Sequence, residues 1–236
     1  MAGNAATPNT PGKTGTRLMT EEAHEALIAR FRDGTLPSGT FLSMPMLVER
    51  LGLPLAAVRE AVKRAEASGL VTVLPKRGVQ VMDAGPDMTR ECLDLRAIFD
   101  VEGAKRLIVR RADIPLAALR DAHERLRDEA EGNMADDLSQ RAIATDLSLH
   151  DALSLGLGST LARRLYDENR NRIAIIQNTR PFLPVRIASA MDEHLAIIAA
   201  LEAGDAEKAE VEIRAHLANT LRWWGVSPDR TDAIPT

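Results

Sequence analysis

The sequence predicts a mainly α-helical protein in two parts, an N-terminal winged helix-turn-helix domain followed by an antiparallel six-helix bundle. Three observations carry this prediction. Across residues 58–82, a basic segment with helical periodicity is followed by two short β-branched segments. From about residue 86, long helix-periodic segments alternate with glycine and proline breaks. Aromatic residues make up only 3% of the chain, so the core is expected to be aliphatic.

The N-terminal part begins with polar residues. Residues 1–16 contain Asn, Thr, Pro and Gly but little to bury, so we expect a disordered leader there. A first helix is predicted over residues 20–33, where a packing stripe precedes a glycine. Residues 36–40 have the composition of a turn, and a short helix over 45–51 follows.

The next helix is amphipathic. Its apolar residues have helical spacing: Val58, Ala61, Val62 and Ala65. Basic residues lie on or beside the opposite face: Arg59, Lys63 and Arg64. Gly69 can end the helix with a left-handed cap. One side of the helix can therefore pack while the other contacts an anion.

Two strands are predicted after this helix, over residues 70–74 and 79–82. Pro75 and Gly78 bound the connection between them, as in a hairpin turn, and place Lys76 and Arg77 at its tip. The order of helix, turn, helix and two-stranded wing is typical of a winged helix-turn-helix.

The remainder of the chain is predicted to be helical. The expected helices have short connections, as in a bundle, and span residues 86–112, 115–131, 136–156, 159–179, 184–203 and 205–224. The expected domains are a winged helix-turn-helix over residues 17–84 and an all-helical domain over residues 85–226. Residues 227–236 are expected to form a flexible tail.

Charge and composition narrow the class of protein. Residues 17–82 carry nine Lys and Arg against seven Asp and Glu, whereas residues 83–236 carry 20 against 27. This asymmetry favours contact of only the first part with a polyanion. The single cysteine, Cys92, excludes a disulfide framework, and the sequence contains no apolar run of membrane-spanning length. We therefore expect a cytoplasmic protein without a membrane partner.

The first part resembles the DNA-binding domain of the GntR family of bacterial transcription regulators. Several spacings within residues 33–81 carry the resemblance, among them the Val58–Val62 motif VREAV and the Gly69-Leu70-Val71 segment. We expect contacts to double-stranded DNA from helix and wing residues: Arg59, Lys63, Arg64, Lys76, Arg77 and Gly78. The family usually has Ser-Arg before this helix, where this chain has Pro54-Leu55. Loss of that arginine implies an unusual operator or weaker DNA binding.

Polar residues in the second part have the spacing of a metal site. Asp146 and His150 are four residues apart on one helix, while His194 and His216 lie on later helices. One carboxylate and three imidazoles can hold a divalent transition metal. Spacing alone also fits a surface hydrogen bond and isolated histidines. His123, next to charged residues, is expected to be solvated.

The second part resembles the all-helical ligand-binding domain of the FadR-like branch of the GntR family. The resemblance rests on DLSLH at 146–150, on residues 186–205 and on AHL at 215–217. It implies a buried zinc, nickel or manganese ion held by Asp146, His150, His194 and His216, and a small organic acid bound beside it. Arg96 matches an arginine of that domain, and Arg186 lies two helical turns before His194, so both are candidate effector-binding residues.

The expected function is a ligand-responsive transcription regulator, a repressor that binds a palindromic operator as a homodimer. Two-fold symmetry is expected because one recognition helix reads only a few base pairs. A metal sensor without an organic effector is one alternative. A metal-dependent enzyme is another, although no nucleophile with a base is visible in the sequence.

Overall fold

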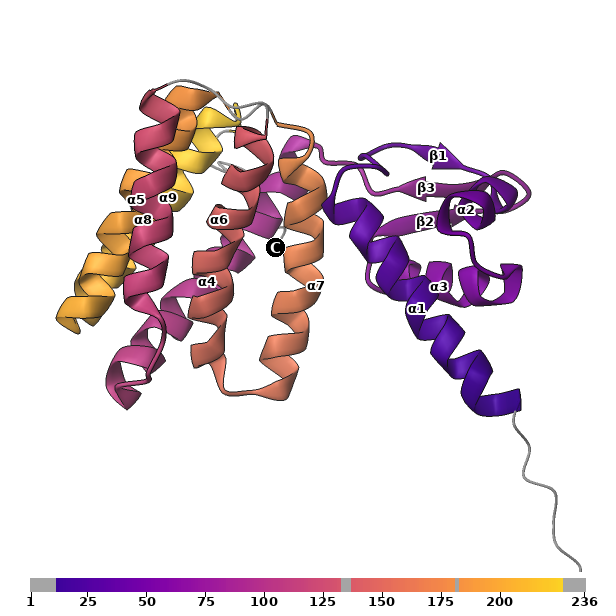
Figure 1. The fold of residues 1–236 in the computed structure, drawn as a ribbon, viewed down its shortest axis with the longest axis horizontal. Helices are drawn as coiled ribbons and strands as arrows, with labels where there is room; N and C mark the ends of the chain where they lie inside the picture. The colour runs from indigo at the N-terminus through magenta and orange to yellow at the C-terminus, as the bar shows by residue number, and fades with distance from the viewer. Residues whose placement is uncertain (1–11, 133–136, 181–182, 227–236) are drawn as a thin grey trace, which may run out of the picture. The chain divides into compact units, whose positions relative to one another are not determined.

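The computed structural model describes residues 12–132, 137–180 and 183–226 (Figure 1). Contacts divide the chain after Met82 into two compact units, Met1–Met82 and Asp83–Thr236. The first contains a helix-turn-helix with a small antiparallel wing, and the second contains six α-helices. The predicted fold class is therefore confirmed.

In the first unit, three helices surround an aliphatic core. They are α1 (Gly12–Arg32), α2 (Met44–Leu51) and α3 (Leu55–Ala67). Helix α1 begins eight residues before the expected start, so residues 12–16 belong to a helix and not to the leader. No apolar periodicity in that stretch could have predicted the extension. Residues 1–11 and 227–236 of the expected leader and tail lie outside the described residues.

The ends of α2 follow from its sequence. Ser43 accepts a hydrogen bond from the backbone N–H of Met46 at its N-terminus, and Gly52 ends the helix with a φ of 66°. Helix α3 packs along α1 and buries its expected apolar stripe, Val58, Ala61, Val62 and Ala65. The basic side of α3 is thereby left exposed.

The wing is a three-stranded antiparallel sheet in the order β1-β3-β2 (Figure 1). Strands β2 (Val71–Leu74) and β3 (Gly78–Val81) form the predicted hairpin. Strand β1 (Phe41–Leu42) was not predicted, because two residues are too few for a periodic signal. It pairs Phe41 with Gln80 and Leu42 with Val79, and so joins the wing to the start of α2.

The second unit follows the predicted helices closely. Its elements are α4 (Pro86–Arg110), α5 (Leu116–Glu131), α6 (Leu138–Ser154), the 3-10 turn η1 (Leu155–Leu157), α7 (Thr160–Gln177), α8 (Pro184–Ala203) and α9 (Ala206–Trp223). Helix α4 packs against α6, α7 and α9, while α5 packs against α8 (Figure 1). A buried aliphatic cluster from α4, α5, α6, α8 and α9 fills the centre of the unit.

Helix α4 and the end of α6 meet at two glycines. A Cβ on Gly103 would lie 2.2 Å from the Leu153 carbonyl oxygen, and one on Gly156 would lie 2.1 Å from that of Gly103. Only glycine permits this backbone contact. The contact sets the separation of α4 and α6, from which the polar residues described below project. No described helix is long and apolar enough to cross a membrane.

Candidate metal centre and nucleic-acid interface

Four side chains from three helices converge inside the second unit. Asp146 and His150 project from α6, His194 from α8 and His216 from α9. All four are buried, and one ligand atom from each lies within 4.8 Å of the others. The structure thus brings together the four residues that the sequence suggested.

The separations suit a single ion. His194 Nε2 lies 3.3 Å from His216 Nε2 and 3.5 Å from Asp146 Oδ1. His150 Nε2 lies 4.0 Å from Asp146 Oδ2 and, though buried, has no hydrogen-bond partner. Because metal bonds to nitrogen and oxygen are about 2.0–2.2 Å long, two ligands of one ion are at most roughly 4.4 Å apart. A small contraction would therefore complete the site.

The pKa shifts of the clustered side chains also favour the protonation states that bind a metal cation. Burial, together with the charges of His216 and His150, lowers the pKa of His194 well below its usual value. Burial lowers the pKa of His216 too, despite its hydrogen bond with Glu193. Burial by itself raises the pKa of Asp146, but the charges of His150 and Arg96 outweigh it and the net shift is downward. Neutral imidazoles, as the lowered pKa values of His194 and His216 favour, and an ionised carboxylate are the forms that bind metals.

Two carboxylates orient the histidines from behind. His150 Nδ1 lies 2.7 Å from Asp100 of α4, and His216 Nδ1 lies 2.7 Å from Glu193 of α8. Each carboxylate accepts a hydrogen bond from Nδ1–H, which fixes the proton on Nδ1 and leaves the lone pair of Nε2 to face the centre. The sequence analysis missed both partners, because the pairs are separated by 50 and 23 residues and follow no helical period.

Arg96 lies directly beside the cluster. Its Nη2 is 3.3 Å from His216 Nε2, and its Nη1 is 3.5 Å from Asp146 Oδ2. Nη1 is buried and makes no hydrogen bond. A guanidinium with an unused donor can bind a carboxylate that reaches the centre.

Arg186, unlike Arg96, has hydrogen-bond partners for both of its terminal nitrogens. It forms an ion pair with Glu193, with Nη1 and Oε1 2.9 Å apart, and donates a hydrogen bond of 2.9 Å to the Thr220 hydroxyl. Because Glu193 in turn holds His216, Arg186 stabilises the partner of a ligand as well as bordering the centre.

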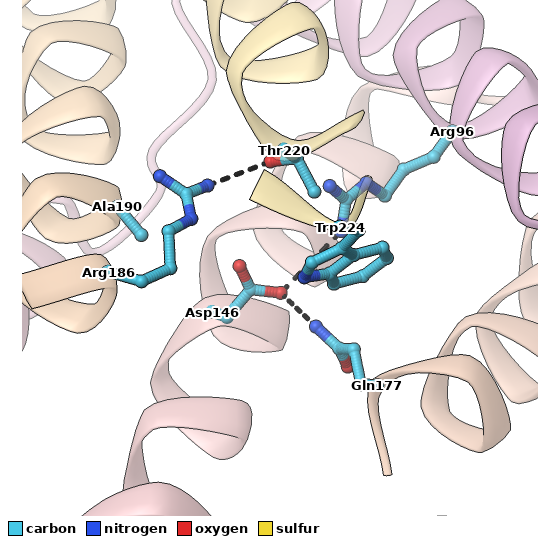
Figure 2. A pocket seen from close by; sticks show the side chains of 7 residues that line it. All are labelled: Arg96, Asp146, Gln177, Arg186, Ala190, Thr220 and Trp224. Carbon is cyan, nitrogen blue, oxygen red and sulfur yellow. Dashed lines mark hydrogen bonds and ion pairs between the residues drawn. The ribbon is translucent and has the colours of Figure 1, made fainter. Parts of the chain in front are cut away.

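A pocket connects these residues. It is lined by Arg96, Asp146, Gln177, Arg186, Ala190, Thr220 and Trp224. Figure 2 shows the Trp224 ring beside Asp146, which is linked to both Arg96 and Gln177. Gln177 donates to Asp146 Oδ2 across 2.7 Å. The open core of the pocket holds about one water molecule, so a larger ligand has to displace side chains.

His123 differs from the expectation of a solvated side chain. It is 0% exposed, and its ring packs against that of His194 with centroids 5.2 Å apart. The charged neighbours of His123 in the sequence suggested an exposed position. In the structure His123 is one of the buried residues of α5, the helix that packs against α8.

Helix α3 presents its basic side chains in different settings. Arg59 is exposed, and no ion pair of its guanidinium is found in the part of the chain that the structure describes. Lys63 forms an exposed ion pair with Glu60 of the same helix, 2.7 Å long. Arg64 pairs with Glu21 of α1 at 2.9 Å, on the side of α3 that packs along α1. Leu55, at the first position of α3, is 43% exposed.

The wing tip places Lys76 and Arg77 in solvent. Lys76 has a φ of 62°, a left-handed conformation that costs a non-glycine residue roughly 1–2 kcal/mol. Gly78 has a steric role, because a Cβ there would lie 2.3 Å from the Leu42 carbonyl oxygen of β1.

Each of the two units matches a known protein family. Residues 19–81 match the family of bacterial regulatory proteins of the gntR type, and residues 91–219 match the FCD domain. An uncharacterized HTH-type transcriptional regulator from the TAR-I ttuE-ttuC' intergenic region of Agrobacterium vitis is 29% identical over 134 residues. These cover 56% of this chain and 76% of that protein.

Solved structures share the fold. A GntR transcriptional regulator from Rhodococcus sp. RHA1 aligns over 91% of this chain and 100% of its own, with a TM-score of 0.69 and 22% identity. E. coli McbR/YncC aligns over 86% and 95%, with a TM-score of 0.68 and 19% identity. The FCD match alone spans more than half of the sequence, and the winged helix precedes it in the expected order. The chain therefore belongs to the GntR family of bacterial transcription regulators, with an FCD domain following its DNA-binding helix-turn-helix.

Proposed function

We propose that this regulator adjusts its affinity for an operator when a small organic acid binds at a metal centre in the FCD domain. The observation that carries the proposal is the convergence of Asp146, His150, His194 and His216 beside a pocket that contains Arg96. The family is one of transcription regulators and not of enzymes. The centre is accordingly a binding site, not a catalytic one.

The donor set fits a divalent ion of the zinc, nickel or manganese type. Three imidazoles and one carboxylate suit these metals, and the carboxylates behind His150 and His216 fix the ring orientations. When bound, the ion supplies a Lewis acid to which a carboxylate oxygen can coordinate. Asp146, His150, His194 and His216 would hold it, and Gln177 would keep Asp146 in position through its hydrogen bond.

Counting the charges around the centre favours a carboxylate effector. Asp146, Asp100 and Glu193 contribute three negative charges, and Arg96 and Arg186 contribute two positive charges, a net charge of −1. A divalent ion raises this to +1, and one carboxylate restores neutrality. Because buried net charge is costly, the metal-loaded site favours an anion. Arg96, with its unused Nη1, is the residue expected to bind the second carboxylate oxygen.

A homodimer is supported by exposed apolar side chains on the FCD domain. Helices α4 and α7 pack together, and between them they expose Leu95, Ile98, Leu161 and Leu165, at 37%, 61%, 59% and 42% respectively. Leu155 of η1 is exposed as well, at 54%. Apolar side chains gathered on neighbouring helices mark a contact surface. A second copy of this chain is the proposed occupant, and its symmetry would match a palindromic operator.

The proposed DNA contacts are Arg59 and Lys63 on α3, and Lys76 and Arg77 on the wing. Arg64 is a weaker candidate, because Glu21 already binds it. We expect Arg59→Ala to weaken binding to duplexes selected by the wild-type protein from a random-sequence library. The slope of log K against log salt should fall by about 0.9 if one phosphate contact is lost. Arg125→Ala, which removes an exposed arginine from α5 of the second unit, is the control. An unchanged slope for Arg59→Ala would exclude Arg59 from the interface.

The metal and effector are tested on metal-stripped protein by thermal denaturation. Zinc, nickel or manganese should each raise the Tm, and a panel of small carboxylic acids should raise it further only in the presence of metal. His194→Ala should remove the metal effect without unfolding the first unit. Arg96→Ala should retain the metal effect and lose the effect of the acid. Full metal occupancy in His194→Ala would contradict the four-ligand site.

A metal sensor without organic effector is the second candidate, favoured by the small free space in the pocket. In that case metal alone would change DNA affinity and no acid would add to it. Repression is the expected mode of control, because a dimer that covers its operator excludes polymerase. Transcription in vitro from a template that carries the selected site tests this, and activation by the bound protein would contradict it.

A further inference from the structure

Each of the three histidines at the centre needs a partner for the ring nitrogen that faces away from it. Asp100 serves His150 and Glu193 serves His216, both at 2.7 Å. His194 Nδ1 has no hydrogen-bond partner, although the side chain is 0% exposed. A metal ligand that binds through Nε2 carries its proton on Nδ1, so His194 has a buried donor that needs an acceptor.

The neighbouring His123 has the opposite requirement. Its Nδ1 lies 2.7 Å from the Leu119 carbonyl oxygen, which can only accept, so Nδ1 carries the proton. Its Nε2 therefore carries a lone pair, and this atom too is buried without a hydrogen-bond partner.

We propose that His123 is the positioning residue of His194, accepting a hydrogen bond from His194 Nδ1–H at Nε2 when the metal is bound. The two rings already pack together, with centroids 5.2 Å apart and planes inclined by 63°. With the metal on His194 Nε2, one buried donor and one buried acceptor lie on adjacent rings. A small adjustment of α5 against α8, which pack along each other, brings the atoms together.

The inference rests on the proposed metal centre and extends it to α5, which contributes no ligand. It also gives His194 a neutral acceptor where the other two histidines have carboxylates. A third carboxylate would add a further negative charge to the buried set. An imidazole satisfies the donor without altering the charge balance that favours one carboxylate effector.

The experiment compares zinc affinity in the full-length protein, measured by calorimetric competition with a chelator. His123→Phe keeps a ring of similar size and removes the acceptor, and it should raise the zinc Kd about 10- to 100-fold. His123→Gln retains an acceptor and should recover affinity to within about threefold of the wild type. His24→Gln, on α1, is the control and should leave the Kd unchanged. The Tm of each metal-free variant shows whether the protein remains folded.

Nitrogen NMR of the histidine rings reports which ring nitrogen carries the proton, a property that does not depend on packing alone. In the zinc-loaded protein, His123 should be protonated on Nδ1 alone, and His194 should carry its proton on Nδ1. An unaltered zinc Kd in folded His123→Phe would overturn the inference, and so would a His123 Nε2 resonance that shows direct coordination of zinc. Absence of zinc binding by the wild type would instead reject the metal centre itself.

Discussion

At the scale of single residues, neighbours in the fold decide which cations are available to DNA. Arg59 and Lys63 are separated by one helical turn, but Lys63 has Glu60 as a partner 2.7 Å away. Arg64 forms an ion pair with Glu21 of α1. Exposed ion pairs of this kind contribute little stability, so a phosphate can displace them at low cost. Arg59 and the wing tip need no such exchange.

Because the backbone of Lys76 is strained, substitutions there can separate the effect of its charge on DNA binding from the effect of its conformation on stability. Lys76→Gly should leave the wing as stable or stabilise it by about 1 kcal/mol, because glycine accepts a φ of 62°. It should also weaken DNA binding and lower the salt slope by about 0.9. Titrations of selected duplexes at several salt concentrations, with urea unfolding in parallel, measure both effects.

Lys76→Ala is the matched control for this prediction. It removes the same charge but keeps a side chain in the left-handed region, so the loss of DNA affinity should equal that of Lys76→Gly while stability does not improve. If Lys76→Gly binds DNA as tightly as the wild type, the lysine has no contact with the backbone of the duplex.

At the scale of elements, the contact of α4 with the end of α6 and with η1 holds part of the proposed metal site in register. Asp100 precedes Gly103 by one turn on α4, and His150 lies one turn before the close contact on α6. The hydrogen bond between Asp100 and His150 therefore depends on the short separation that the two glycines allow.

Gly103→Ala tests that dependence. The added Cβ, 2.2 Å from a carbonyl oxygen, must push the elements apart and should cost about 1–3 kcal/mol of unfolding free energy. Zinc affinity should fall with it, because Asp100 no longer reaches His150. Gly132→Ala, where the nearest contact is an ordinary 3.6 Å, should change stability by less than about 0.5 kcal/mol. Equal stabilities for the two variants would refute the argument.

The elements were largely predictable, and the reasons are local. Helix α8 begins at Pro184 and ends before Gly204, so its bounds follow from two residues. Strand β1 was missed, because its existence depends on β3, nearly forty residues away. The four proposed metal ligands were predicted from an i, i+4 pair and a family resemblance, and the structure brings them together. Their partners Asp100 and Glu193 are visible only once α4, α6, α8 and α9 are packed.

At the scale of the molecule, the buried histidines couple stability to pH. In the metal-free protein the pKa values of His123, His194 and His216 lie below 6.5, and in the unfolded chain they return to about 6.5. As the pH falls below that value, the unfolded chain binds protons that the folded chain does not. Stability is therefore fully present above pH 6.5 and is lost as the pH falls.

Urea unfolding of metal-free protein at pH 7.5, 6.5 and 5.5 measures this loss. The carboxyls with lowered pKa, such as Glu193, bind protons only below their ordinary 4.5, so they do not contribute in this range. Zinc should increase the stability most at pH 7.5, since protons compete with the ion for the imidazoles. A free energy of unfolding that stays constant from pH 7.5 to 5.5 would contradict the burial of neutral histidines.

The backbone contact between Gly103 and Gly156 distinguishes two kinds of helix packing in the FCD domain. Helix α4 and the end of α6 touch through peptide groups, which have no rotamers to exchange. Helices α8 and α9 meet the rest through side chains, which can repack. Release of an ion would thus leave α4 and α6 protected from amide exchange, while α8 and α9, which carry His194 and His216, open first. Binding of the ion would then mainly stabilise α8 and α9, the helices whose side-chain contacts can repack.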